Sequence, residues 1–153
     1  MPHIQRAGGS VFVTFVTVGR EVLPSDARVI VLECCLHDRG VELQMHAAVV
    51  MPDHVHLLFT PLRDEQGFYF GLAEIMSGIK GASAHGVNKL LRRSGRLWQR
   101  ESFDHALRMA ESLRGTAEYI CANPVRAGLV RLEDQYRWLW REWVEGGEVD
   151  DSR

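Results

Sequence analysis

The chain has 153 residues, a length that fits one domain, and 46% of them are hydrophobic, which is enough for a buried core. The formal net charge of −2 does not by itself indicate a nucleic-acid binder. No apolar run reaches the roughly 18 residues of a membrane span, and the N-terminus lacks a signal-peptide pattern. The three cysteines, Cys34, Cys35 and Cys121, have no metal-type spacing. We therefore expect a cytoplasmic protein in a reducing compartment, with no membrane association.

The charges are distributed unevenly along the chain. Residues 80–108 hold seven Lys or Arg and two acids, a local balance of +5, whereas residues 133–151 hold seven acids and two arginines, a balance of −5. This asymmetry indicates either a basic surface followed by an acidic tail or two ordinary solvated faces. We expect a single domain over residues 1–153, with its core in about 11–143 and an acidic tail in 144–153.

The first predicted elements are a strand and a helix. Residues 11–18 are rich in Val, Phe and Thr, and both of their faces are apolar, which is typical of a central strand. Residues 25–38 lie between a capping Ser25 or Asp26 and Gly40, which favours a helix. The apolar run within them leaves a strand as the alternative.

Two alternating runs follow. Residues 41–51 place Val, Leu, Met and Ala at every second position, with Glu42, Gln44 and His46 on the other face. After the Pro52-Asp53 turn, Val55, Leu57 and Phe59 share one face, and the opposite face carries His54, His56 and Leu58. Two such runs across a short turn predict an antiparallel pair of strands.

Helical spacing predicts a helix that starts after Asp64 and continues towards Leu91 despite three glycines, and another over residues 111–122. Between them, residues 97–107 are expected to be partly extended. Pro124 is expected to stop the last helix, because the residue before proline avoids helical geometry. These elements together predict an α+β fold, an antiparallel sheet with helices packed on it.

The two histidines of the second strand are the first candidate ligands. His54 and His56 are two positions apart, so both imidazoles leave the same face of the sheet. Such a pair can bind one divalent ion, although the spacing alone is more often that of two surface or structural histidines.

Tyr119 is the candidate nucleophile. In the last helix, Leu113, Ala117, Ile120 and Cys121 form one apolar stripe, and Tyr119 falls on roughly the opposite side. Asn123 follows at i+4 and shares its side of the helix, where its amide oxygen could complete a metal shell. A phenol with a pKa near 10 is a poor nucleophile, but it can attack a phosphodiester that a metal polarises. The plain alternative is an exposed aromatic that packs on a loop.

These residues resemble the motifs of a known family. Residues 50–58, VMPDHVHLL, resemble the His-hydrophobic-His motif of the single-tyrosine transposases. Residues 119–130, YICANPVRAGLV, resemble the tyrosine motif of one branch, the REP-associated tyrosine transposases, as do LWQR at 97–100 and FDH at 103–105. The similarity runs in order from about residue 11 to residue 143.

The resemblance implies a ferredoxin-like antiparallel sheet with flanking helices. It implies a divalent ion, Mg or Mn, held by His54, His56 and a polar side chain near the tyrosine, for which Asn123 is the match. It implies that Tyr119 cuts single-stranded DNA beside a hairpin of repetitive extragenic palindrome type. The products would be a 5′-phosphotyrosine and a free 3′-hydroxyl, in a DNA transposition carried out by a monomer or a homodimer.

Basic side chains are the expected DNA contacts, because they would bind phosphates. The candidates are Lys80, Lys89, Arg92, Arg93, Arg96, Arg100 and Arg126. Trp98, by contrast, is expected to pack in the core, and His46 and His105 to be structural histidines. The three tryptophans Trp138, Trp140 and Trp143 are expected to pin the C-terminal segment to the domain.

Two other functions remain possible from the sequence. One is a non-catalytic, domesticated protein that binds DNA hairpins, and a more distant one is a zinc hydrolase acting on small molecules. The acidic tail, with Glu145 and Asp150, is expected to lie over the basic surface and weaken DNA binding.

Overall fold

Five antiparallel strands form one sheet in the order β4-β1-β3-β2-β5. The computed structural model describes residues 9–108 and 112–143. The strands are β1 (Val11–Val16), β2 (Leu43–Val50), β3 (His54–Pro61), β4 (Phe103–Ala106) and β5 (Leu139–Arg141). The expected pairing of β2 with β3 and the central position of β1 are confirmed.

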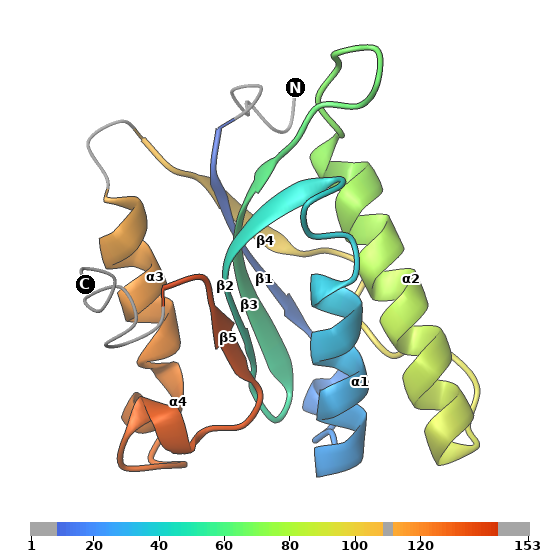
Figure 1. The fold of residues 1–153 in the computed structure, drawn as a ribbon. Helices are drawn as coiled ribbons and strands as arrows, with labels where there is room; N and C mark the ends of the chain where they lie inside the picture. The colour runs from blue at the N-terminus through green and yellow to red at the C-terminus, as the bar shows by residue number, and fades with distance from the viewer. Residues whose placement is uncertain (1–8, 109–111, 144–153) are drawn as a thin grey trace.

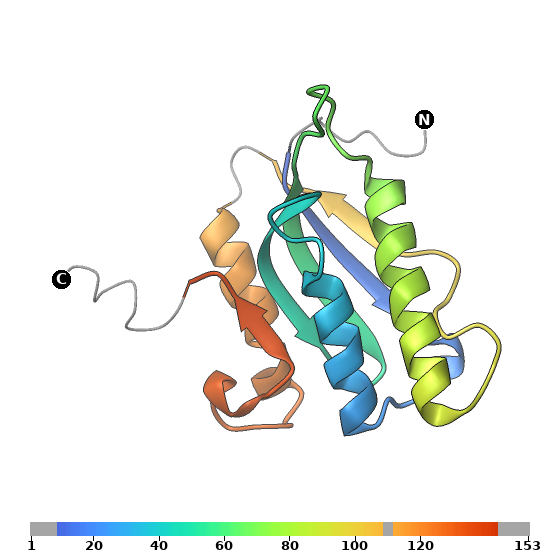
Figure 2. The ribbon, with the colours of Figure 1, turned by 45° about the vertical axis from the view of Figure 1, so that its right-hand side comes forward.

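The helices cover both faces of this sheet (Figures 1 and 2). Helices α1 (Ser25–Leu36) and α2 (Leu72–Leu91) lie side by side on one face. Helix α3 (Leu113–Cys121) and the short α4 (Asn123–Arg126) lie on the other. Two short 3-10 turns, η1 (Val18–Arg20) and η2 (Glu133–Gln135), complete the described elements. The expected α+β architecture with flanking helices is confirmed, and no described helix is long and apolar enough to cross a membrane.

Each face of the sheet has its own apolar core. Between the sheet and α1 and α2, Phe15 and Phe59 are fully buried with Val31 and Ile75. Between the sheet and α3, a smaller cluster contains Leu58, Ala117, Ile120 and Cys121 among others. Because side chains alternate along a strand, burying both faces requires nearly continuous apolar strands, which is the pattern of β1 to β3.

The prediction that the alternating residues of 41–51 share one face is wrong. A bulge between Met45 and Ala47 shifts the register against β3, so the alternation changes phase at His46. Leu43 and Met45 face α1 and α2, whereas Ala47, Val49 and Met51 face α3. Val41 lies outside the strand and is exposed.

The predicted helix at 25–38 is confirmed as α1, which excludes the strand alternative. The predicted start of the next helix after Asp64 is wrong, since α2 begins at Leu72. Asp64 instead closes a turn, where its Oδ1 accepts hydrogen bonds from the backbone N–H groups of Gln66 and Phe68. Gly86 is required inside α2, because a Cβ there would lie 2.8 Å from Cγ2 of Ile30 in α1.

The predicted end of the last long helix before Pro124 is confirmed, since α3 ends at Cys121. The predicted reason is wrong, because Asn123 is itself helical: α4 begins there with Pro124 in its first turn, a position where a missing N–H costs nothing. The following segment adds β5 to the edge of β2. There Trp138 and Trp140 pack against the larger core, and Trp143 packs against the smaller one, which confirms that they pin this segment.

Candidate functional site

The two histidines lie at the start of β3 on the face that α3 covers. Their ring centroids are 4.8 Å apart. Each Nδ1 is already engaged: that of His54 with Oδ1 of Asp53 at 2.7 Å, and that of His56 with Oγ1 of Thr14 at 2.8 Å. The Nε2 atoms of both rings are thus the nitrogens left for a ligand. Histidines that bind metals in proteins are held in the same way by a partner on the other nitrogen.

The electrostatics of the pair favour ligand binding. Burial, with the positive charges of His54 and Arg126, lowers the pKa of His56 from 6.5 to about 4, so this ring is neutral near pH 7. Burial alone would raise the pKa of Asp53, but its hydrogen bond with His54 and the charge of Arg20 bring it below its usual value. A neutral imidazole beside an ionised carboxylate is the arrangement that a cation requires.

Thr14 and Arg20 are site residues that the sequence analysis missed. Thr14 lies directly opposite His56 in the β1–β3 pairing, and Arg20 forms an ion pair with Asp53. A polar threonine inside the otherwise apolar Val11–Val16 strand was the one sequence signal for the first. Arg20 gave no such signal, because its contact with Asp53 depends on how η1 folds.

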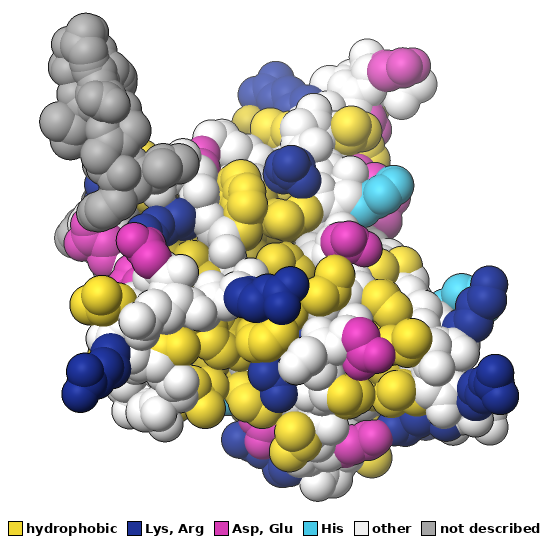
Figure 3. Space-filling view, turned by 60° about the horizontal axis from the view of Figure 1, so that its bottom comes forward, with side chains coloured by type: hydrophobic (Ala, Val, Ile, Leu, Met, Phe, Trp, Pro, Cys, Tyr) yellow, Lys and Arg dark blue, Asp and Glu magenta, His cyan; other side chains and the backbone are white. Residues whose placement is uncertain are grey.

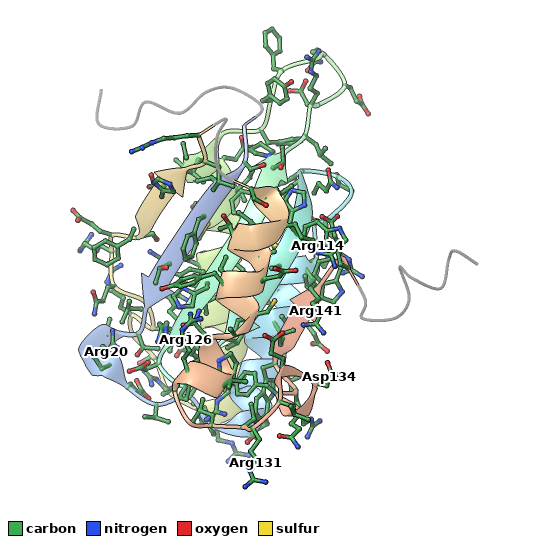
Figure 4. All side chains as sticks on the ribbon, turned by 90° about the vertical axis from the view of Figure 1, so that its left-hand side faces the viewer. Arg20, Arg114, Arg126, Arg131, Asp134 and Arg141 are labelled. Atoms are coloured by element: carbon green, nitrogen blue, oxygen red, sulfur yellow. The ribbon has the colours of Figure 1, made fainter. Side chains whose placement is uncertain are left out.

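Tyr119 lies in the second half of α3 and is 60% exposed. Its helix packs on β2 and β3, across the same sheet face as the histidines (Figure 4). The α3–α4 junction and the turn before His54 lie at the same end of the molecule, the lower end in Figure 1. The tyrosine helix therefore ends on the side of the sheet where β3 begins.

Arg126 contacts Tyr119 and exerts its charge on His56. Its guanidinium carbon lies 4.1 Å from the centroid of the Tyr119 ring, and its Nη2 donates to the backbone oxygen of Tyr119 at 3.0 Å. Its charge also contributes to the lowered pKa of His56. One arginine thus acts on both of the side chains that the motifs single out.

Asn123 is half-buried at the start of α4. Its Nδ2 donates to the backbone oxygen of Ile120 at 3.0 Å, so its Oδ1 is the atom available to bind a ligand. Among the described residues, no three His, Cys, Asp or Glu side chains gather as a metal cluster. A third protein ligand beside His54 and His56 would therefore come from another kind of side chain, and an amide oxygen is suitable.

The predicted DNA-contacting residues do not form one surface. Arg126 is at the histidine site, while Lys80, Arg96 and Arg100 line a groove of about 1240 Å³ between α2 and residues 96–104, on the other side of the molecule. Lys80 is fixed there, because its Nζ donates to the backbone oxygens of Gln99 and Arg100. Burial, with the charge of Arg96, lowers the pKa of this lysine.

The basic residues at the C-terminal end of α2 belong to the end of the molecule that holds the histidines. Lys89 and Arg92 are exposed there, whereas Arg93 forms an ion pair with Glu21. Seen from this end, Lys and Arg side chains are scattered among apolar, acidic and polar side chains (Figure 3). Lys89 and Arg92 are thus exposed at the same end of the molecule as the histidines, although α2 lies on the opposite face of the sheet.

Three remaining expectations concern histidines and Trp98. Trp98 is buried, with its Nε1 donating to Oγ of Ser83 at 2.9 Å, so it packs in the core as expected. His46 is a structural histidine that contacts Glu142 and, at 2.7 Å, Oγ1 of Thr60. His105 is exposed on β4 and pairs with Phe12 of β1.

One sheet covered by helices on both faces, with paired histidines on a central strand and the Tyr119 helix packed on the same face, agrees with the transposase motifs. The model of the family described as IS200-like transposases matches residues 22–123. This range holds both histidines, Tyr119 and Asn123, and covers more than half of the chain. The chain therefore belongs to the IS200-like transposase family.

Relatives agree with the resemblance to the REP-associated branch. A protein of Haemophilus influenzae described as a REP-associated tyrosine transposase is 26% identical over 91 residues, 56% of this chain and 52% of that relative. The matched region thus spans about half the length of that relative. A solved REP-associated tyrosine transposase bound to a REP hairpin is 22% identical, with a TM-score of 0.71 over 99% of this chain and 84% of that one, and it has the same fold. A transposase structure from Deinococcus radiodurans is also 22% identical, with a TM-score of 0.48 over 80% of this chain and 94% of that one.

Proposed function

We propose that this chain nicks single-stranded DNA at a hairpin of the REP type and transfers the strand through a covalent tyrosine intermediate, in a metal-dependent reaction. The observation that carries the proposal is the histidine pair, whose Nε2 atoms are left for a ligand on the sheet face that the Tyr119 helix covers. Family membership and the hairpin bound by the similar solved transposase support DNA as the substrate. The free cysteines support a reducing, cytoplasmic setting.

The donor set fits a divalent ion such as Mg or Mn. Nε2 of His54, Nε2 of His56 and Oδ1 of Asn123 would hold it, a mixed nitrogen and oxygen set. When bound, such an ion polarises a phosphodiester and offsets the negative charge that develops on it. Asp53 and Thr14 orient the two rings by their contacts with each Nδ1.

Tyr119 supplies the nucleophile. Its phenol oxygen forms a bond to phosphorus while the bond from phosphorus to the 3′ oxygen breaks, and the phenol proton goes to solvent. The 3′ oxygen takes up a proton and leaves as a free hydroxyl, and the 5′ phosphate remains on the tyrosine. Attack by another 3′-hydroxyl on this phosphotyrosine reverses these bonds and completes strand transfer. Arg126 lies close enough to the phenol ring to neutralise charge on the phosphate.

A labelled single-stranded DNA hairpin incubated with Mn²⁺ tests the proposal. The wild-type chain is expected to form a protein–DNA species that survives denaturation, and Tyr119→Phe is expected to lose it while still binding the hairpin. The matched control is Tyr69→Phe, since Tyr69 is a second exposed tyrosine that also contacts an arginine, Arg63. Replacing both His54 and His56 with Ala should abolish the adduct as well.

Two outcomes of the same assay would contradict the proposal. A denaturation-resistant adduct on Tyr119→Phe would show that another group is the nucleophile. Hairpin that the wild-type chain binds but never cuts, with either Mg²⁺ or Mn²⁺, would favour a non-catalytic hairpin-binding protein instead.

A further inference from the structure

We propose that Arg20 is a positioning residue that acts through Asp53 to fix the ring orientation and tautomer of His54. The inference deepens the proposed function and rests on it, because it assigns a task to a side chain outside the motifs. Arg20 is far from His54 in the sequence and touches it only through the carboxylate.

Two contacts link the three side chains in series. Nε of Arg20 lies 3.0 Å from Oδ2 of Asp53, and Oδ1 of the same carboxylate lies 2.7 Å from Nδ1 of His54. Because each oxygen has its own partner, the plane of the carboxylate is held from both sides. Without Arg20, the Asp53 side chain would be free to turn about its Cα–Cβ bond and carry the carboxylate away from Nδ1 of His54.

Hydrogen bonds to the backbone fix the positions of Arg20 and Asp53 relative to each other. Thr17 is fully buried, and its N–H donates to the backbone oxygen of Asp53 at 3.0 Å. Its hydroxyl lies within hydrogen-bond distance of that same oxygen and of the backbone oxygen of Glu21, at 3.2 and 2.8 Å. Thr17 thereby ties the start of the η1 turn to the chain just before His54 and also holds Glu21, on the far side of Arg20.

Stability does not explain why an arginine occupies this position. Arg20 has φ = 57°, one of two non-glycine residues with positive φ in the described part of the chain, and this region disfavours side chains with a Cβ. Its side chain is 61% exposed, so water and salt screen the ion pair. A residue that has a strained backbone conformation and adds little to stability is typical of a functional site.

The contact with Asp53 determines which ring nitrogen of His54 carries the proton. A carboxylate only accepts hydrogen bonds, so its contact with Nδ1 places the proton there and leaves the lone pair on Nε2. That tautomer is the one that can bind an ion on the side away from Asp53. Arg20 thus affects ligand binding without touching the ligand.

Arg20→Asn is the variant that tests this chain of contacts. Asparagine tolerates a positive φ, so the turn should fold, but its side chain is too short to hold Asp53. The matched control is Arg131→Gln, which removes the same charge from an exposed loop and whose side chain points away from the protein (Figure 4).

Nitrogen NMR of isotope-labelled histidine, in metal-free protein at neutral pH, is the first readout, with His54→Gln to assign the His54 signals. The wild type and Arg131→Gln should show His54 protonated at Nδ1, and Arg20→Asn should show a mixture of tautomers. Titration with Mn²⁺, followed by electron paramagnetic resonance, should give a dissociation constant raised about tenfold in Arg20→Asn alone.

The two readouts separate the inference from the function on which it rests. An unchanged His54 tautomer in Arg20→Asn overturns the inference, whatever the metal titration gives. A changed tautomer with unchanged Mn²⁺ affinity overturns the link to ion binding. If replacing His54 and His56 with Ala leaves Mn²⁺ binding intact, the proposed metal site itself fails, and the NMR result still decides whether Arg20 holds the ring.

Discussion

The two faces of the sheet are built from the same strands but differ in chemistry. The face under α1 and α2 buries an apolar cluster with Phe15, Phe59 and Leu57. The face under α3 buries a smaller cluster around Leu58, and it also carries the histidine pair. A strand such as β3 contributes side chains to both faces, because alternate side chains point to opposite faces. One face thus supplies most of the stability, and the other is free to hold polar groups.

The largest expected effect comes from the apolar face. Phe59→Ala removes a fully buried ring and should cost about 3–5 kcal/mol of unfolding free energy, measured by urea denaturation. Phe68→Ala is the control, since this ring is 70% exposed and its loss should cost less than about 0.5 kcal/mol. Equal losses of unfolding free energy in the two variants would contradict the conclusion that this face supplies most of the stability.

An intermediate effect is expected from His56 on the other face. Burial lowers the pKa of this histidine from 6.5 to about 4, so the unfolded chain binds its proton more readily than the folded one does. Its contribution to stability is complete above pH 6.5 and is lost as the pH falls towards 4, in total about 3 kcal/mol. Urea denaturation at a series of pH values, with a chelator present, measures it.

The control for the pH series is His56→Gln, which keeps a polar group opposite Thr14 but does not titrate. Its stability should fall less steeply than that of the wild type over the same pH range. Parallel pH profiles for the two proteins would show that His56 is not the group responsible.

The smallest expected effect concerns the hydrogen bond that holds the segment after α4. The hydroxyl of Tyr136 is buried and donates to the backbone oxygen of Val50 at 2.6 Å. Tyr136→Phe should cost about 1 kcal/mol, because the oxygen loses its donor without access to water. Tyr69→Phe, on the exposed turn after β3, should be neutral in the same urea assay. A neutral Tyr136→Phe would mean that this contact adds nothing to the α3 face.

Much of the fold was predictable because patterning reports burial directly. The alternation at 54–59 placed His54, His56 and Leu58 on one face, and the structure confirms it. The bulge after Met45 was not predictable, since one extra residue changes the face without changing the composition. The helical restart at Asn123 was missed for a related reason: Pro124 breaks an existing helix but favours the first turn of a new one.

The candidate site was predictable only where its residues lie close together in the sequence. His54, His56, Tyr119 and Asn123 fall within recognisable motifs, and their assigned roles stay predictions. Thr14 and Arg20 reach the histidines through strand pairing and a turn, so the polar Thr14 within an apolar strand was the one local signal, and Arg20 had none. The basic run of 80–108 indicated a charged segment, but it could not show that Arg93 is paired with Glu21.

The connectivity of the sheet has a consequence for where the tyrosine can lie. Helix α3 comes between β4 and β5 in the chain, and these two strands occupy opposite outer positions of the sheet. The path from one border to the other has to traverse the full width of the sheet, and it passes over the central β3. The position of the Tyr119 helix over the sheet is therefore set by chain routing before any local contact refines it. Insertions or deletions in the segments joining α3 to those outer strands should misplace the phenol even when every motif residue is intact.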